Sequence, residues 1–274
     1  MILGALLGMR KGARSAAARW LAFAPGALLS VGMLALFLDL AHKLYVWRFY
    51  LAFRWTSPMS WGAWILVVAY PVSILLALGD LEEGEAARVE AFLGRFGLAS
   101  LARITRALAS PRLPALRLAS IGVGVGLGVY TGILLSTLGA RALWSSALLG
   151  PLFLVSGVST GAALMMLFPV SDEERHALGR WDLAAIGIEL LLIALWLVGL
   201  ATSGAAARDA AALVLGGRFT AQFWTIVVAA GLFVPALLEA LEARLALRFT
   251  LAAPALVLVG GFAMRWVLVA AGQA

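Results

Sequence analysis

Seven long apolar stretches, separated by short polar segments, constrain this chain more than any other feature of its sequence. About 20 consecutive apolar residues are enough for a helix to cross the hydrocarbon core of a membrane. Backbone amides cannot stay unpaired in that core, so each stretch must be helical. We therefore predict an all-α fold, a polytopic membrane helical bundle with seven full spanning helices. The stretches cover about residues 20–41, 59–79, 114–138, 146–170, 182–202, 219–241 and 249–271.

The composition supports a membrane protein and limits the cofactors that it can hold. Hydrophobic residues make up 63% of its 274 residues and charged residues only 13%, whereas a soluble domain carries about 25% charged residues. The sequence has no cysteine and only two histidines, His42 and His176. It therefore cannot form a disulfide or hold a cysteine-ligated zinc or iron–sulfur cluster alone. Because only His42 lies near a span, we also expect no haem and no metal on this chain.

Lysine and arginine residues are distributed unevenly between the two sides of the predicted bundle. Fourteen of them flank the spans on one side and six on the other, while Arg265 lies inside a span. By the positive-inside rule, the richer side is cytoplasmic. Loop 80–113 is then cytoplasmic and loop 42–58 is outside. We attribute the net charge of +7 to this topology and expect no nucleic-acid partner.

The cytoplasmic loop 80–113 carries the pattern of an amphipathic helix. Four apolar residues recur at helical spacing and form one face, namely Val89, Phe92, Leu93 and Phe96. The segment that follows is similar and basic, which suits anionic membrane lipids. A helix on the membrane surface and a simple connector are both consistent with this pattern. We see no soluble domain and treat residues 1–274 as a single transmembrane domain.

Polar side chains from several spans are predicted to lie in one layer near the outer face. Asp39 and His42, at the outer end of the first span, are three residues apart and would share one helical face. Arg265 needs a partner inside the membrane, and Asp39 lies at a similar depth. The layer is either a set of ion pairs that hold helices together or a polar cavity with proton-transfer groups. Other members of the layer include Trp61, Tyr130, Ser156 and Ser159.

Four remaining features are weaker indications of function. The aromatic residues between positions 47 and 64 are typical of a membrane interface. Glycines 124, 128 and 132 recur every fourth residue, which lets helices approach closely. His176 lies in residues 171–182, which we predict to be a charged cytoplasmic loop. Glu189 differs from the other intramembrane polar residues because it lies in the inner half of its span.

Four ordered blocks of the sequence resemble the NrfD/PsrC family of quinol-interacting membrane subunits in polysulfide reductase-like complexes. The resemblance runs from about residue 20 to the C-terminus, and it depends on the combination of blocks. The blocks are LDLAHKLYVWRFYLAFRWTSPMSWGAWIL, GVYTGILLS, GPLFLVSGVSTGAA and GGFAMRWVLVAAGQ. Family members usually begin with a full extra helix, and residues 1–9 look like only the last part of it. We therefore expect a short N-terminal remnant of an eighth helix.

The resemblance implies a membrane subunit that exchanges electrons between the quinone pool and a partner outside the cytoplasm. The quinone would be an exchangeable menaquinone or ubiquinone. The partner would be an iron–sulfur subunit with four ferredoxin-like clusters, docked on the outer face. A molybdopterin, multihaem cytochrome or hydrogenase subunit would lie beyond it. Such complexes belong to the cytoplasmic membrane of bacteria or archaea.

The resemblance also gives the polar residues expected roles. His42 and Asp39 would transfer protons to and from the quinone, and Glu189 would belong to a proton path from the cytoplasm. The quinone pocket would be formed by Tyr130, Thr131, Ser156, Ser159, Trp61 and Arg265. Two alternatives stay open: a purely structural or proton-conducting anchor of such a complex, and a solute transporter. A transporter is less favoured because broken helices and inverted repeats are expected of it.

Overall fold

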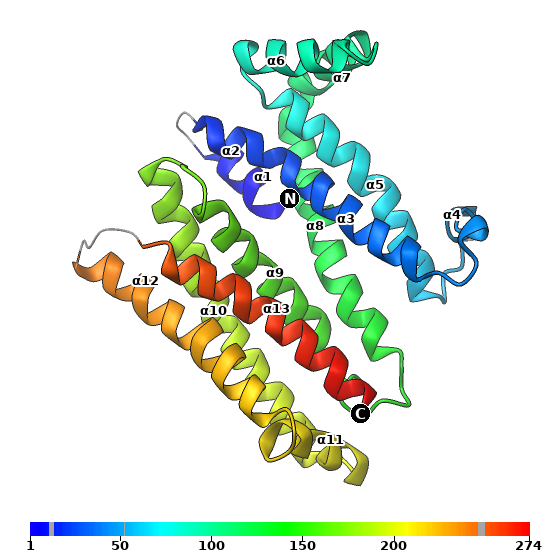
Figure 1. Ribbon diagram of the computed structural model, residues 1–274, viewed down its shortest axis with the longest axis vertical. Coiled ribbons are helices and arrows are strands. Elements are labelled where there is room, and N and C mark those ends of the chain that lie inside the picture. The colour runs from blue at the N-terminus through cyan, green and yellow to red at the C-terminus, as the bar shows by residue number, and fades with distance from the viewer. Residues whose placement is uncertain (11–13, 52, 246–249) are drawn as a thin grey trace. The chain divides into compact units, whose positions relative to one another are not determined.

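The computed structural model describes residues 1–10, 14–51, 53–245 and 250–274 (Figure 1). Every regular element in these ranges is helical. Seven helical segments of the described residues are long and apolar enough to cross a membrane, namely Ala16–Asp39, Pro58–Gly79, Ala99–Ser136, Leu149–Met166, Asp172–Thr202, Gln222–Glu242 and Ala252–Gln273. The predicted helical bundle with seven spans is thereby confirmed. Lys11, Arg248 and the predicted start of the last span at residue 249 lie outside the described residues.

The polypeptide divides into two compact units, Met1–Leu127 and Gly128–Ala274, which are described separately below as unit 1 and unit 2. The expectation of a single domain stays a prediction. Helix α8 (Leu113–Ser136) contributes its first part to unit 1 and its last part to unit 2.

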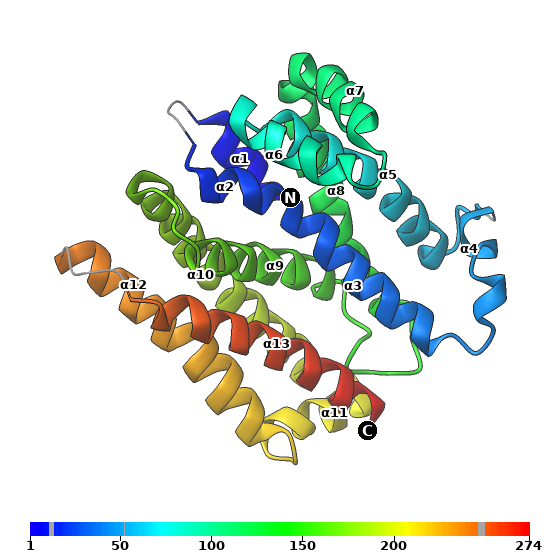
Figure 2. The same ribbon diagram turned by 45° about the horizontal axis from the view of Figure 1, so that its top comes forward.

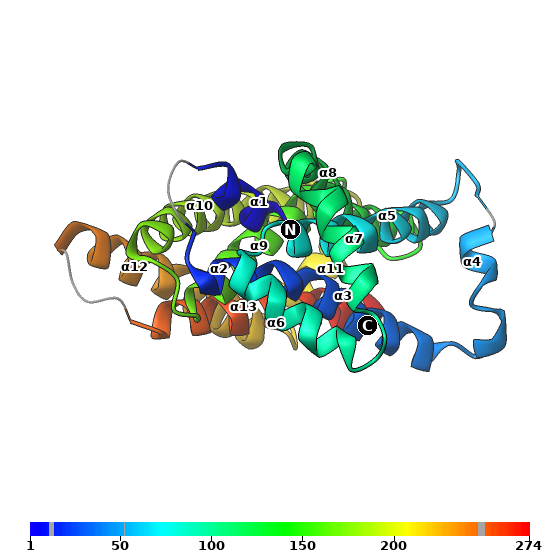
Figure 3. The same cartoon turned by 90° about the horizontal axis from the view of Figure 1, so that it is seen from above.

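Unit 1 begins with α1 (Ile2–Met9), the short segment that precedes the spans. The connection from α3 to α5 carries a 3-10 turn and the short helix α4, and it lies at one edge of this unit (Figure 3). The other elements of unit 1 are α2 (Ala16–Trp20), η1 (Leu21–Phe23), α3 (Ala24–Asp39), η2 (Lys43–Tyr45), α4 (Arg48–Leu51), α5 (Pro58–Gly79), α6 (Glu83–Gly94), α7 (Ala99–Ala109) and η3 (Ser110–Arg112).

The predicted amphipathic loop 80–113 consists of α6, α7 and η3. Helix α6 begins with a capping box in which the side chains of Glu82 and Glu85 each accept a bond from the other's backbone. Gly97 has a φ of 75° between α6 and α7, a left-handed conformation that favours glycine. Val89 packs on the small core of Leu78, Leu81 and Ala86. In contrast, Phe92 and Phe96 are 58% and 66% exposed, so part of the apolar face stays uncovered within unit 1.

Unit 2 is built from long helices that pack side by side (Figures 1 and 2). Helix α9 packs on both α10 and α13, and α13 also packs on η4 and α12. The segment η4 is a π-helix, a winding with one residue more per hydrogen-bonded turn than an α-helix. These elements are α9 (Leu149–Met166), α10 (Asp172–Thr202), α11 (Ala205–Leu215), η4 (Gln222–Phe233), α12 (Val234–Leu245) and α13 (Ala252–Gln273).

Close backbone contacts define the packing inside unit 2. A Cβ atom built on Gly260 of α13 would lie 2.2 Å from the Cα of Gly231 in η4. A Cβ atom on Gly132 would lie 2.4 Å from the backbone of Leu149, where α8 meets α9. The predicted close approach at the glycine repeat is therefore confirmed at Gly132. The Nε1–H of Trp144 donates to the Leu268 carbonyl at 2.7 Å and fixes the α8–α9 connection on α13.

The prediction of a charged loop at residues 171–182 was wrong, because α10 begins at Asp172. Ser171 caps the helix: its hydroxyl accepts from the Glu174 amide at 3.3 Å, and the Glu174 carboxylate accepts from the Ser171 amide at 2.9 Å. Acidic residues in the first turn also favour the positive end of the helix dipole. As a consequence, His176 and Asp182 lie on a continuous helix of 31 residues.

Candidate functional site

A cavity of about 500 Å³ lies in unit 1, at the connection between α3 and α5. Its volume is within the range of small-molecule sites, which combine apolar walls with a few polar groups. The polar groups here are a histidine, two arginines and two serines. The lining residues are Leu40, Ala41, His42, Tyr45, Arg48, Arg54, Ser57, Met59 and Ser60. The cavity can therefore accept a flat apolar ligand that carries hydrogen-bonding atoms at its edge.

Local contacts hold several of the polar side chains around this cavity. The His42 ring packs edge-on against Tyr45, with a centroid distance of 6.3 Å. The Arg48 guanidinium lies 4.4 Å above the Tyr45 ring in a cation–π contact. At the other end of the connection, the Arg54 amide donates to the Ser60 hydroxyl at 3.0 Å. His42 thus lies between an aromatic wall and the open volume of the cavity.

The predicted helical face shared by Asp39 and His42 is wrong. Helix α3 ends at Asp39, and Leu40 takes an extended conformation with ψ of 127°. The exposed Asp39 is not among the described residues that line the cavity, whereas His42 is. Because the helix ends before His42, these two side chains are not stacked on one helical face.

Trp61 belongs to an aromatic cluster at the start of α5. Its Nε1–H donates to the Trp55 carbonyl at 2.8 Å, and its ring contacts Trp55 edge-on at 5.4 Å. Phe53 packs against the rings of Trp55, Trp61 and Trp64 at 4.8, 6.0 and 5.8 Å. The cluster holds the α3–α5 connection on the end of α5, next to the cavity.

Unit 2 brings together three of the predicted residues in its interior. Arg265 donates from Nη1 to the Ser156 hydroxyl at 3.3 Å and to the Gly261 carbonyl at 2.7 Å. Ser156 lies within hydrogen-bonding reach of Glu189, whose charge interacts favourably with that of Arg265. Ser156 and Glu189 are only 1% and 2% exposed. Arg265 therefore has a partner within its own unit, and the predicted pair with Asp39 stays a prediction.

Ser159 is engaged by a different carboxylate. Its hydroxyl donates to Asp182 Oδ1 at 2.6 Å, and the Asp182 carboxyl lies within hydrogen-bonding reach of Glu239 of α12. Asp182 is completely buried and Glu239 is 7% exposed. Asp182, Glu189 and Glu239 are thus buried carboxyl groups within the spans of unit 2, which also contain Arg265; a fourth buried carboxyl among the described residues of this unit, Glu174, belongs to the cap of α10.

Tyr130 and Thr131 lie on α8, in its unit 2 part. Tyr130 is half-buried, and Thr131 is exposed with its hydroxyl donating to the Gly128 carbonyl at 3.1 Å. The single layer of polar residues from both units stays a prediction, as does the assignment of these two residues to a quinone pocket.

Comparison with known proteins decides the family. The family model described as polysulphide reductase, NrfD, matches residues 2–274. The chain belongs to the NrfD family. It is 29% identical to a polysulfide reductase chain of Wolinella succinogenes, over 89% of this chain and 78% of the relative. It is 31% identical to the protein NrfD of Escherichia coli, over 91% of this chain and 80% of the relative.

A third relative covers a smaller part. A tetrathionate reductase subunit of Salmonella typhimurium is 30% identical over 70% of this chain and 51% of its own length. No solved structure matches the chain. As an NrfD-family member with seven apolar helices among its described residues, the chain is a multi-pass membrane protein related to membrane subunits of reductases. The resemblance predicted from the four sequence blocks is confirmed.

In this NrfD-family protein, sequence reasoning missed Asp182 and Glu239. Asp182 was placed at the end of a loop, although it is seven residues before Glu189 and hence on the same face of one helix. Glu239 lies inside the sixth predicted span, where an ionisable residue is itself an indication of function. The length of α10 and the depth of Glu239 were the signals that could have found the pair.

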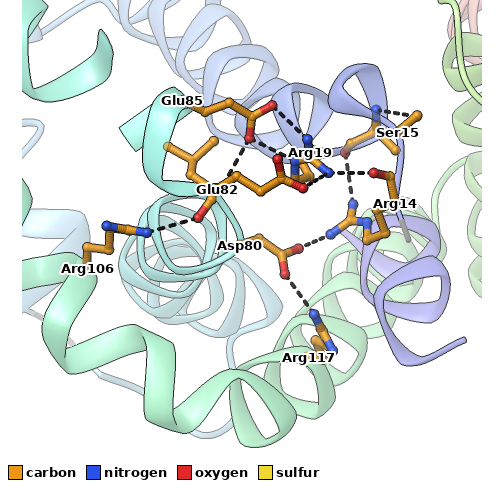
Figure 4. Close-up of polar contacts among 10 residues, drawn as sticks. Arg14, Ser15, Arg19, Asp80, Glu82, Glu85, Arg106 and Arg117 are labelled. Atoms are coloured by element: carbon orange, nitrogen blue, oxygen red, sulfur yellow. Dashed lines mark hydrogen bonds and ion pairs between the residues drawn. The ribbon is translucent and has the colours of Figure 1, made fainter. Parts of the chain in front are cut away.

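An ion-pair network in unit 1 joins segments that are far apart in the sequence (Figure 4). Asp80, directly after α5, pairs with Arg14 and accepts from Arg117 Nη2 of α8 at 2.7 Å. Arg106 of α7 donates to the Leu81 carbonyl at 3.3 Å. From the sequence these arginines indicate only the topology, whereas in the structure Arg14 and Arg117 hold α2 and α8 on the end of α5.

The same network contains a two-point ion pair. Arg19 donates to both Glu85 oxygens, at 2.8 Å from Nε and 3.0 Å from Nη2, and it also pairs with Glu82 at 2.9 Å. The hydrogen bonds from Arg19 lower the pKa of Glu85 below its ordinary value, although burial opposes this. Glu85 is therefore ionised at neutral pH and holds α2 on α6.

Proposed function

We propose that this chain is the quinone- or quinol-interacting membrane subunit of a multisubunit respiratory oxidoreductase. The cavity around His42 carries the proposal, because it occurs in an NrfD-family protein whose relatives include a polysulfide reductase chain. The protein would lie in the cytoplasmic membrane of a bacterium or archaeon. It would exchange electrons with a four-cluster ferredoxin-like subunit on the outer face. A molybdopterin, multihaem cytochrome or hydrogenase subunit would lie beyond that partner.

The residues of the cavity fit a quinone headgroup. Leu40, Tyr45 and Met59 provide apolar surface, while His42 and Arg54 provide hydrogen-bonding groups at the edge. A bound menaquinone or ubiquinone supplies chemistry that moves two electrons and two protons. His42 can hold or release one of these protons at a ring nitrogen.

The remaining residues have supporting roles in the proposal. Asp39 relays protons between His42 and the outer solvent. Trp61 supports the α3–α5 connection that carries His42. Tyr130 can donate a hydrogen bond to a quinone oxygen, whereas Thr131 can only accept one from a quinol hydroxyl, because its own proton is donated to the Gly128 carbonyl. Ser156, Ser159 and Arg265 were predicted as pocket residues. Since Ser159 donates to Asp182, and Arg265 donates to Ser156 close to Glu189, we propose that they act mainly on protons.

A proton-conducting anchor is the second candidate function. The observation that favours it is the set of Glu189, Ser156 and Arg265 in unit 2, where a buried carboxyl and a buried serine lie close to a partly buried arginine. In this candidate, Glu189 belongs to a path that connects the cytoplasmic side with the interior. Both functions can coexist in one subunit. They are tested by substitutions at different residues, because the quinone proposal depends on His42 and the proton path on Glu189.

Variants of His42 and Tyr130 test the quinone proposal. We expect His42→Ala to lower quinol-driven electron transfer about 100-fold, the lower end for a general acid–base group. Tyr130→Phe removes one hydrogen bond, and we expect a loss of about tenfold. The measurement is turnover of the isolated complex with a reduced quinol analogue, normalised to the content of its subunits.

His176→Ala is the matched control, because His176 is the other histidine and is exposed on α10. Its turnover should equal that of the unmodified complex. If both His42→Ala and Tyr130→Phe leave turnover unchanged in an assembled complex, the site assignment is wrong.

A further inference from the structure

Two carboxyl groups from different helices meet inside unit 2. Asp182 lies on α10, ten residues after its first residue, and Glu239 lies on α12. Asp182 is 0% and Glu239 7% exposed, so neither charge is hydrated. The two side chains are within hydrogen-bonding reach of each other. On the other side of Asp182, the Ser159 hydroxyl donates to Oδ1 at 2.6 Å.

If both groups were ionised, most of their oxygen atoms would have no donor. Counted as carboxylates, Asp182 Oδ2 and both Glu239 oxygens are buried without a hydrogen-bond donor among the described residues. A carboxylate can only accept, whereas a protonated carboxyl can donate one bond. One proton between the two groups therefore turns an unsatisfied contact into an O–H···O bond from Glu239 to Asp182 Oδ2.

The surrounding charges support the same conclusion. In the described part of the sequence, neither carboxyl forms an ion pair with a lysine, arginine or histidine. The charged groups that act on Glu239 are Asp182 and Glu242, both negative. Along α10, the next carboxyl is Glu189, whose charge interacts favourably with that of Arg265. Two adjacent buried negative charges without a cation are costly, and sharing one proton removes one of them.

We infer that Asp182 and Glu239 form a proton-binding site that holds one shared proton in the interior of unit 2. Glu239 carries the proton and donates it to Asp182, whose remaining charge is stabilised by the Ser159 hydroxyl. The site differs from the His42 cavity, and it requires neither a quinone nor a partner subunit.

The position of the pair indicates what it does. Asp182 and Glu239 lie near the ends of their spans that the lysine and arginine distribution predicts to be cytoplasmic. Glu189 is seven residues further along α10, a rise of about 10 Å. Asp182 contacts Ser159 and Glu189 contacts Ser156, so two serines of α9 face two carboxyls of α10. The pair is therefore placed to take up protons from the cytoplasm and pass them towards Glu189 and Arg265.

Infrared spectroscopy of the full-length protein in lipid nanodiscs tests the inference. At pH 7 an ordinary carboxyl, with a pKa of about 4, is ionised and shows no carbonyl stretch of a protonated acid. We expect the unmodified protein to show such a band at pH 7, shifted on exchange into D₂O. Glu239→Gln should lose this band, and Asp182→Asn should move it, because the acceptor of the hydrogen bond changes. Glu173→Gln, which removes an exposed carboxyl from the same helix, should leave it unchanged.

Two results would overturn the inference. The first is an unmodified protein with no protonated-acid band at pH 7, or with a band that Glu239→Gln leaves in place. The second is a band that exists only in sodium-free buffer, since that would assign the two carboxyls to a bound cation in place of a proton. The measurement on the unmodified protein stands even where a variant does not fold. None of these readouts uses quinol turnover, so failure here and failure of the quinone proposal are distinguishable.

Discussion

Arg19 and Glu85 show how a single ion pair at the membrane boundary can stabilise the fold. Because Arg19 lowers the pKa of Glu85, the pair contributes its full stability above the ordinary glutamate pKa of 4.5. That contribution is lost as the pH falls through the lowered pKa, where Glu85 takes up a proton. The pair therefore stabilises unit 1 at neutral pH and does not stabilise it in strong acid.

Glu85→Gln should lower the free energy of unfolding at pH 7 by about 1.5–3 kcal/mol, the value of hydrogen bonds to a charged group. The difference from the unmodified protein should shrink as the pH drops below 4.5, since both proteins are then neutral at this position. Thermal unfolding in detergent over a series of pH values measures this difference in the free energy of unfolding. Glu83→Gln, an exposed residue in the same turn of α6, is the control. If Glu85→Gln lowers the free energy of unfolding equally at every pH, Glu85 is not held as an ionised partner of Arg19.

At the residue level, the polar residues of the spans could be predicted from the sequence, but their contact partners could not. Arg265, Ser156 and Glu189 were all identified as buried polar residues of the spans. Their mutual contacts were not, because they join positions that are 109 residues apart in the case of Arg265 and Ser156. Depth in a membrane follows from local hydropathy, whereas the rotation of each helix about its axis depends on packing with distant helices.

The crossing of η4 and α13 sets the packing of unit 2 at the scale of elements. The two backbones approach at Gly231 and Gly260 so closely that no side chain fits between them. We expect Gly260→Ala to lower the free energy of unfolding by about 1–3 kcal/mol, the usual cost of overpacking. Thermal unfolding of the variant in detergent measures this loss of stability.

Gly187→Ala on α10 is the matched control, since nothing lies within 4 Å of a Cβ built there. That substitution should leave stability unchanged or raise it by about 1 kcal/mol, because alanine favours a helix more than glycine does. Equal effects of the two substitutions would show that the close approach of η4 and α13 does not determine stability.

The ends of a helix were predicted correctly where a change in hydropathy marks them. They were missed where a capping box marks them. Helix α5, predicted over residues 59–79, begins at Pro58 and ends at Gly79. For α10, the apolar run begins ten residues after the helix does, so a search for apolar stretches misses its charged first turns. The Ser171 and Glu174 capping box was present in the sequence and indicates the true start.

The topology of the whole molecule is open to a direct test, because the sequence contains no cysteine. A single introduced cysteine is then the only thiol of the protein. We expect Thr56→Cys and Ser203→Cys to react with a membrane-impermeant maleimide in intact cells, since both positions are exposed in predicted outer loops. Ser110→Cys, exposed in the predicted cytoplasmic segment, should react only after lysis. The opposite pattern would reverse the predicted orientation.

We propose above all that electrons pass between quinol and the rest of the complex through this protein. The most direct test is to isolate the intact complex from native membranes, add a reduced quinol analogue, and follow its iron–sulfur signals by electron paramagnetic resonance. We expect the clusters to become reduced, and a quinone-site inhibitor to block that reduction. Clusters that accept electrons from dithionite but never from the quinol would contradict the claim and leave the protein as an anchor.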